Sequence, residues 1–150
     1  MTCKCGRQTN DPSGICAICT WRSCKREHPG MKHFNMGNVW GRVAGMKLEK
    51  SEGKGTPNLA FQIECPNQLY GNIKTYGWLW GQEKIDAFLD YRKKHPGAAY
   101  RFQGFFSQYD KEEGLRYSNY TFFSWLPFEG GEYRAAFVLT GEVTTKENLN

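Results

Sequence analysis

The sequence predicts a mainly β protein: a small closed barrel of five to six strands with one helix between the third and fourth strands, plus a small N-terminal zinc-binding module. Three observations predict this fold class. From residue 37 onward, most segments alternate apolar and polar residues with a period of two. One segment with helical periodicity interrupts them. Before them, two closely spaced cysteine pairs lie within the first 20 residues.

The two cysteine pairs, one Cys-x-Cys and the other Cys-x-x-Cys, are separated by a ten-residue loop that contains glycine and proline. This spacing can present four thiolates to one tetrahedral ion, and zinc suits such a site because it binds sulfur well. The segment holds few apolar residues, so it cannot offset its ordering entropy without the metal. Four thiolates leave no open coordination position, which makes the zinc structural. The predicted ligands are Cys3, Cys5, Cys16 and Cys19.

Other interpretations of the cysteines are weaker. Disulfides would suit an exported chain, but the start of the chain has no apolar run of the length that a signal peptide needs. A redox pair normally opens a helix after a strand, and no strand is predicted before Cys16. The sequence leaves open whether Cys24 or His28 replaces one of the four ligands.

Three strands come first in the predicted barrel, at residues 38–49, 59–65 and 69–80. Gly41 and Gly45 interrupt the first of them. Glycines inside a strand indicate bulges or strong coiling, which a strand needs when it curls around a closed sheet.

A helix is predicted next, at residues 82–95, because Ile85, Phe88 and Leu89 recur at helical spacing and Pro96-Gly97 follows. Further strands are predicted at 98–109, 115–125 and 134–143. Three strands, a helix and two strands form the order of the five-stranded Greek-key barrel known as the OB-fold. The predicted division is 1–20 zinc-binding module, 21–36 basic linker, 37–143 barrel and 144–150 flexible tail. As a separate module, residues 1–20 are expected to unfold on metal removal without affecting the barrel.

The third strand carries the clearest functional signal. Its even positions hold Tyr70, Lys74, Tyr76, Trp78 and Trp80, and its odd positions hold small and aliphatic residues, including Ile73 and Leu79. Since alternate side chains face opposite sides of a strand, we expect the aliphatic set inside the barrel and the rings outside. The reverse orientation is less favoured, because Tyr and Trp need polar partners when buried and Lys avoids burial. Trp78 and Trp80, at the strand end, are the rings most prone to a structural role.

Exposed rings beside a cation suit bases that stack and phosphates that need neutralising. Trp40 and Arg42 share one face of the first strand, opposite Val39 and Val43. Similar parity arguments add one residue each from the second and fourth strands. The predicted nucleic-acid-binding residues are Trp40, Arg42, Gln62, Tyr70, Lys74, Tyr76, Trp78 and Arg101.

Composition supports this interpretation only in part. The formal net charge is +5, of which +4 falls in residues 1–36, and this is too mild to indicate nucleic-acid binding by itself. Aromatic residues make up 15% of the chain, which is the sharper signal. No apolar stretch approaches the ~18 residues of a membrane span. Unpaired thiols and the absent export signal predict a cytoplasmic protein of a bacterial cell or phage-infected host.

Residues 37–143 resemble single-stranded-DNA-binding proteins of the OB-fold type, in particular the small replication-associated proteins of phages and bacteria. The resemblance rests on the strand order and the aromatic third strand. It implies non-catalytic, sequence-tolerant binding of single strands during replication or recombination. The aromatic strands 98–109 and 115–125 also suit a homodimer interface.

Two other function classes are alternatives to this interpretation. A zinc-ribbon and OB-fold accessory module that binds acyl-CoA or a partner enzyme subunit shares this architecture. An enzyme is less favoured, because the sequence contains no phosphate loop, Gly-x-Ser-x-Gly elbow or His-Asn-His pattern.

Overall fold

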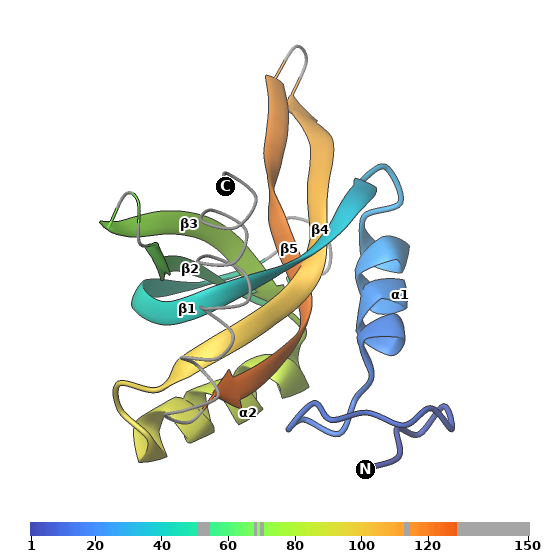
Figure 1. Cartoon of the computed structure of the whole chain (residues 1–150). Helices are drawn as coiled ribbons and strands as arrows, with labels where there is room; N and C mark the ends of the chain where they lie inside the picture. The colour runs from blue at the N-terminus through green and yellow to red at the C-terminus, as the bar shows by residue number, and fades with distance from the viewer. Residues whose placement is uncertain (51–54, 68, 70, 113–114, 129–150) are drawn as a thin grey trace, which may run out of the picture.

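The computed structural model describes residues 1–50, 55–67, 69, 71–112 and 115–128. The predicted strand 134–143, the predicted tail 144–150 and the end of the predicted barrel lie outside the described residues. The described elements are α1 (Ala17–Glu27), β1 (Lys32–Lys50), β2 (Pro57–Asn67), β3 (Gly71–Trp80), α2 (Gln82–Lys94), β4 (Ala99–Glu112) and β5 (Leu115–Phe128) (Figure 1).

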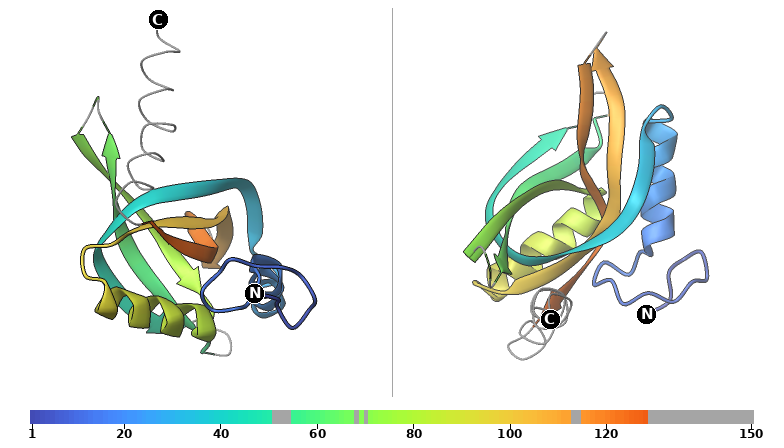
Figure 2. Two further views of the ribbon diagram at one scale, coloured as in Figure 1. Left: turned by 60° about the horizontal axis from the view of Figure 1, so that its bottom comes forward. Right: turned by 45° about the horizontal axis from the view of Figure 1, so that its top comes forward.

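The five strands close into a barrel in the order β1-β2-β3-β5-β4, with β4 paired back to β1. Neighbouring strands are antiparallel except β3 and β5, which run parallel. Helix α2 connects β3 to β4 and lies across one end of the barrel (Figure 2). This is the OB-type architecture, so the predicted fold class is confirmed.

The barrel interior is filled mainly by aromatic rings. Phe61 lies 4.6 Å from Phe102, and Phe88 of α2 lies 4.9 Å from Tyr100, measured between ring centroids. Gly77 of β3 allows this packing, because a Cβ atom there would lie 2.5 Å from the ring of Phe122. Because Gly77 has no side chain, the ring of Phe122 on β5 packs directly against the backbone of β3.

A bulge between β4 and β5 decides which aromatic residues of these strands are core. Gln103 pairs with Ser124 and Gly104 with Phe122, so Phe123 is the extra residue. As a result Phe122 and Trp125, three positions apart, both face the interior, and Phe123 joins a second cluster outside the barrel. Strict alternation along β5 could not have produced this arrangement.

The predicted linker at residues 21–36 is wrong. Most of this segment belongs to α1 and to the start of β1, which pairs with β4 from Lys32 onward. Thr20 and Cys24 face inward at i, i+4 spacing, and Cys24 packs with Met31, Trp80 and Phe123 in the second cluster. The helical pattern was obscured by the many polar residues between these positions. Helix α1 stands beside the barrel (Figure 1) and makes its main contacts with β5.

Within the described residues, no helix is long and apolar enough to cross a membrane.

Candidate metal centre and nucleic-acid interface

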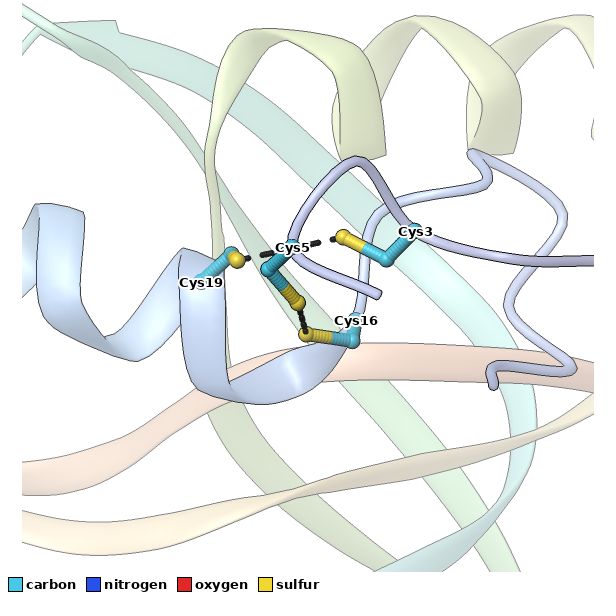
Figure 3. A group of neighbouring side chains, drawn as sticks. All are labelled: Cys3, Cys5, Cys16 and Cys19. Carbon is cyan, nitrogen blue, oxygen red and sulfur yellow. Dashed lines mark hydrogen bonds between the residues drawn. The ribbon is translucent and has the colours of Figure 1, made fainter. Parts of the chain in front are cut away.

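The four predicted zinc ligands come together. The Sγ atoms of Cys3, Cys5, Cys16 and Cys19 all lie within 4.8 Å of one another, and Figure 3 shows them converging from a loop and the start of α1. A tight turn presents the first pair, with the amide of Gly6 donating to the carbonyl of Cys3 and the amide of Cys3 donating to the carbonyl of Arg7. Cys16 is the N-cap of α1, which places Cys19 in its first turn on the same side.

The spacing of the sulfur atoms fits a tetrahedral ion. Cys3 Sγ lies 3.8 Å from Cys19 Sγ, and Cys5 Sγ lies 3.6 Å from Cys16 Sγ. A tetrahedron with Zn–S bonds of about 2.3 Å has edges of about 3.8 Å. The sulfur atoms are too far apart to be disulfide-bonded. The four thiols can therefore hold a metal ion without rearrangement.

Electrostatics within the cluster also favour a cation. Hydrogen bonds from the backbone and the guanidinium of Arg7 lower the pKa of the Cys5 thiol to about 6. Hydrogen bonding to Cys5 and Cys16 raises the pKa of the Cys19 thiol to about 12. A divalent cation would stabilise all four sulfurs as thiolates.

The two alternative ligands that the sequence left open lie elsewhere. Cys24 is fully buried in the second apolar cluster, and burial raises the pKa of its thiol to about 12. The ring of His28 lies 5.4 Å from the ring of Trp80. Neither belongs to the sulfur cluster.

A buried ion pair ties the metal loop to the barrel, and the sequence analysis missed both partners. Asp11, between the two cysteine pairs, places Oδ2 2.8 Å from Nζ of Lys84 in α2, and both side chains are 1% exposed. The amide of Trp125 donates to the same oxygen at 3.1 Å, and Lys84 Nζ also donates to the carbonyl of Ile15. The one sequence signal was a lysine on the apolar face of a helix, next to Ile85.

The outer face of β1, β2 and β3 forms the candidate nucleic-acid interface. We call it the outer face and define it by three cross-strand rows of facing residues. The rows are Arg42–Glu64–Lys74, Gly45–Gln62–Tyr76 and Lys47–Ala60–Trp78. The row of Gln62 and Tyr76 therefore lies between two rows that contain cations: Lys74 and Arg42 on one side and Lys47 on the other. Lys47 was not predicted, because the bulge between Val43 and Gly45 shifts the parity of β1.

Tyr76 is the most exposed described ring of this face, with 54% of its surface accessible. The amide Nε2 of Gln62 donates a hydrogen bond to the Tyr76 hydroxyl at 2.8 Å and fixes the position of the ring. Lys74 is exposed two positions earlier, and Trp78 is half-buried two positions later.

The remaining predicted residues lie at the edges of the outer face or outside it. Trp40 and Arg101 are opposite one another on β1 and β4, with the guanidinium carbon 5.7 Å from the Trp40 ring centroid. Arg42 Nε donates to the carbonyl of Gly97 at 3.0 Å. Tyr70 lies outside the described residues.

Two expectations for β3 need correction. Ile73, expected inside the barrel, is 40% exposed, because it pairs with Cys65 near the tip of the β2–β3 hairpin. Trp80 shares the parity of Tyr76 and Trp78 but is only 3% exposed, since it packs with Cys24 of α1. Leu79 and Gly77 face inward as expected.

No protein-family model matches the chain, and no curated protein matches it. Among solved structures, the chain is similar to two crystal forms of Rim1, a mitochondrial single-stranded DNA binding protein from S. cerevisiae. For the first form the TM-score is 0.47 and the identity 11%, over 65% of this chain and 99% of that chain. For the second the values are 0.45 and 10%, over 67% and 100%.

Proposed function

We propose that the protein binds single-stranded nucleic acid, DNA in particular, without catalysis and with tolerance of sequence. The observation that carries the proposal is the exposed Tyr76 ring, held by Gln62 between rows that contain Lys74 and Lys47. A flat ring flanked by cations matches the two requirements of an unpaired strand: an aromatic surface on which the bases stack, and positive charges that neutralise the phosphates.

Small residues keep the rings accessible. Gly45 lies beside Gln62 in the row of Tyr76, and a Cβ atom built on it would meet nothing within 4 Å. Ala60 separates Lys47 from Trp78 in the next row. The neighbours of these rings on β1 and β2 therefore include two small residues, which leave the outer face open at Gly45 and add little bulk beside Trp78.

The proposal has four further parts. The ion held by the four thiolates is structural zinc, since four sulfur ligands suit zinc and leave no coordination position for a substrate. The protein acts in DNA replication or recombination, in the cytoplasm of a bacterial cell or phage-infected host. The aromatic strands β4 and β5 support association into a homodimer.

Replacing Tyr76 with alanine is expected to weaken binding of an oligothymidylate by ~1–3 kcal/mol, because base stacking on an aromatic ring contributes about that much. Tyr76→Phe keeps the ring and removes only the contact with Gln62, so it is the matched control and should bind nearly as well as the wild type. Anisotropy of a labelled oligonucleotide measures both. Equal affinity of Tyr76→Ala and wild type, with the fold intact, would show that the ring is not part of the interface.

Replacing Lys74 with alanine is expected to reduce the salt dependence of binding. Each phosphate contact on a single strand contributes about 0.7 to the slope of log affinity against log salt, so one lost contact should lower the slope by roughly that amount. Lys93→Ala, on the exposed surface of α2, is the control and should leave the slope unchanged. Salt-independent binding of coenzyme A in place of the oligonucleotide would favour the acyl-CoA accessory function instead.

A further inference from the structure

A cavity of about 310 Å³ lies outside the interface described above, between the metal loop, α1 and the first turn of α2. Its wall includes Lys4 from the metal loop, Arg22 and Arg26 from α1, and Trp80 and Glu83 around the start of α2. Arg22 and Arg26 lie four residues apart, so they share one face of the helix.

The charge of this wall is mainly positive. Lys4, Arg22 and Arg26 are all exposed, and in the part of the chain that the structure describes none of them forms an ion pair. Glu83 opposes them, and the thiolate of Cys19 contributes negative charge when the metal is bound. Arg7 offsets part of that charge from the other side, where its Nη1 donates to Cys5 Sγ. The neighbouring Lys84 is already neutralised by Asp11.

The wall also offers hydrogen-bond donors. Helix α2 begins after Gly81, which has no side chain to cap the first amides, so these donors and the positive end of the helix dipole lie at the cavity. The indole Nε1–H of Trp80 is buried and has no hydrogen-bond partner among the described residues. Backbone amides at a helix start together with arginine side chains are a common setting for phosphate.

Strand β3 runs from the outer face to the cavity. Trp80, in its wall, is the last residue of β3 and has the same parity as Tyr76 and Trp78. Trp80 lies four positions after Tyr76, which is roughly 13 Å along the strand at the usual rise per residue. A nucleic-acid strand stacked on Tyr76 and Trp78 and continuing along β3 would reach the cavity.

We propose that this cavity binds a backbone phosphate of the single strand that lies on the outer face, with Lys4, Arg22 and Arg26 as its cations. The proposal rests on the proposed function and extends it, because it adds α1 and the metal module to the binding surface. It also assigns a role to the zinc: the metal holds Lys4 and the start of α1 in the positions that form the cavity.

The first experiment uses the zinc-loaded full chain and inorganic phosphate as the probe. Phosphate, compared with chloride at equal ionic strength, is expected to shift the NMR signals of the Gln82, Glu83 and Lys84 amides and the Trp80 indole. Absence of shifts at these groups at concentrations of phosphate that saturate any specific site would overturn the proposal.

The second experiment compares Arg22→Ala/Arg26→Ala with Lys93→Ala/Lys94→Ala, which removes two exposed cations from the far end of α2. Loss of this one phosphate contact should reduce the salt slope by about 0.7. When salt is raised from 50 to 200 mM, the fall in affinity of the arginine variant should therefore be smaller than that of the wild type by a factor of about 2.6. The lysine variant should keep the wild-type slope. Arg22→Lys/Arg26→Lys should also keep most of it.

The outcomes separate the two proposals. If the oligonucleotide binds the wild type and binding depends on Tyr76, but the arginine and lysine variants have equal slopes, the cavity proposal is overturned and the proposed function stands. If the oligonucleotide does not bind the wild type, the proposed function is overturned and the cavity proposal with it. Thermal unfolding of each variant confirms that the exposed substitutions leave the fold intact.

Discussion

Replacing Asp11 with alanine is expected to lower the free energy of unfolding by about 3–5 kcal/mol, because removing one partner of a buried ion pair leaves the other charge uncompensated. The carboxylate also accepts hydrogen bonds from the amides of Trp125 and Ser13, which would lose a partner. Urea unfolding followed by tryptophan fluorescence measures the loss. A decrease below 1 kcal/mol would mean that Lys84 finds water or another partner.

The pH dependence of this variant gives an independent test. Burial lowers the pKa of Lys84 and Asp11 raises it, so the pKa falls further when Asp11 is removed. Between the lowered folded pKa and the unfolded value near 10.5, the unfolded state binds more protons, and stability must rise with pH. Asp11→Ala is therefore expected to regain stability as the pH increases toward that value.

Two control variants isolate the buried pair. Asp90→Ala removes the acid of an exposed pair, in which Asp90 lies 3.1 Å from Lys94, and should cost about 0–1 kcal/mol. The double variant Asp11→Ala/Lys84→Met removes both buried charges and should be less destabilised than the sum of the single variants. Additive losses would show that the two charges do not interact in the native protein.

Removing the metal is expected to destabilise the whole protein, beyond residues 1–20. Asp11 lies in the loop between the two cysteine pairs, and its carboxylate is the only acidic partner of Lys84 among the described residues. When the loop loses the ion that orders it, the buried lysine loses its counter-charge. The loss should include the several kcal/mol of that pair, within the ~10–16 kcal/mol typical of structural zinc binding.

Thermal unfolding with and without a chelator, followed by the near-ultraviolet circular dichroism of the buried aromatic residues, measures the effect of the metal. Cys19→Ser should resemble the chelated protein, and Cys65→Ser, a thiol outside the cluster, should resemble the zinc-loaded one. An unchanged barrel transition after complete metal removal would show that the module and the barrel are independent, as the sequence alone suggested.

The elements that the sequence predicted well depend on local patterns. Helix α2 follows the spacing of Ile85, Phe88 and Leu89, and β3 follows the alternation of Leu79 and Gly77 with Trp78 and Tyr76. Helix α1 was missed because its buried positions are Thr20 and Cys24, which are weak apolar signals among charged neighbours. Without α1, the sequence could indicate a structural role for Trp80 but could not show which element buries it.

The local sequence determines that the four thiols can converge. One short turn places Cys3 and Cys5 together, and the start of α1 places Cys16 and Cys19 together. Local patterns also determine the order of strands and helix along the chain. They determine which face of β3 carries Tyr76, because alternation is a property of the strand itself. Contacts between distant segments decide the rest. The bulge opposite Gly104, the burial of Trp80 and the pairing of Asp11 with Lys84 depend on which surfaces meet, and the free energy of those contacts exists only in the closed barrel.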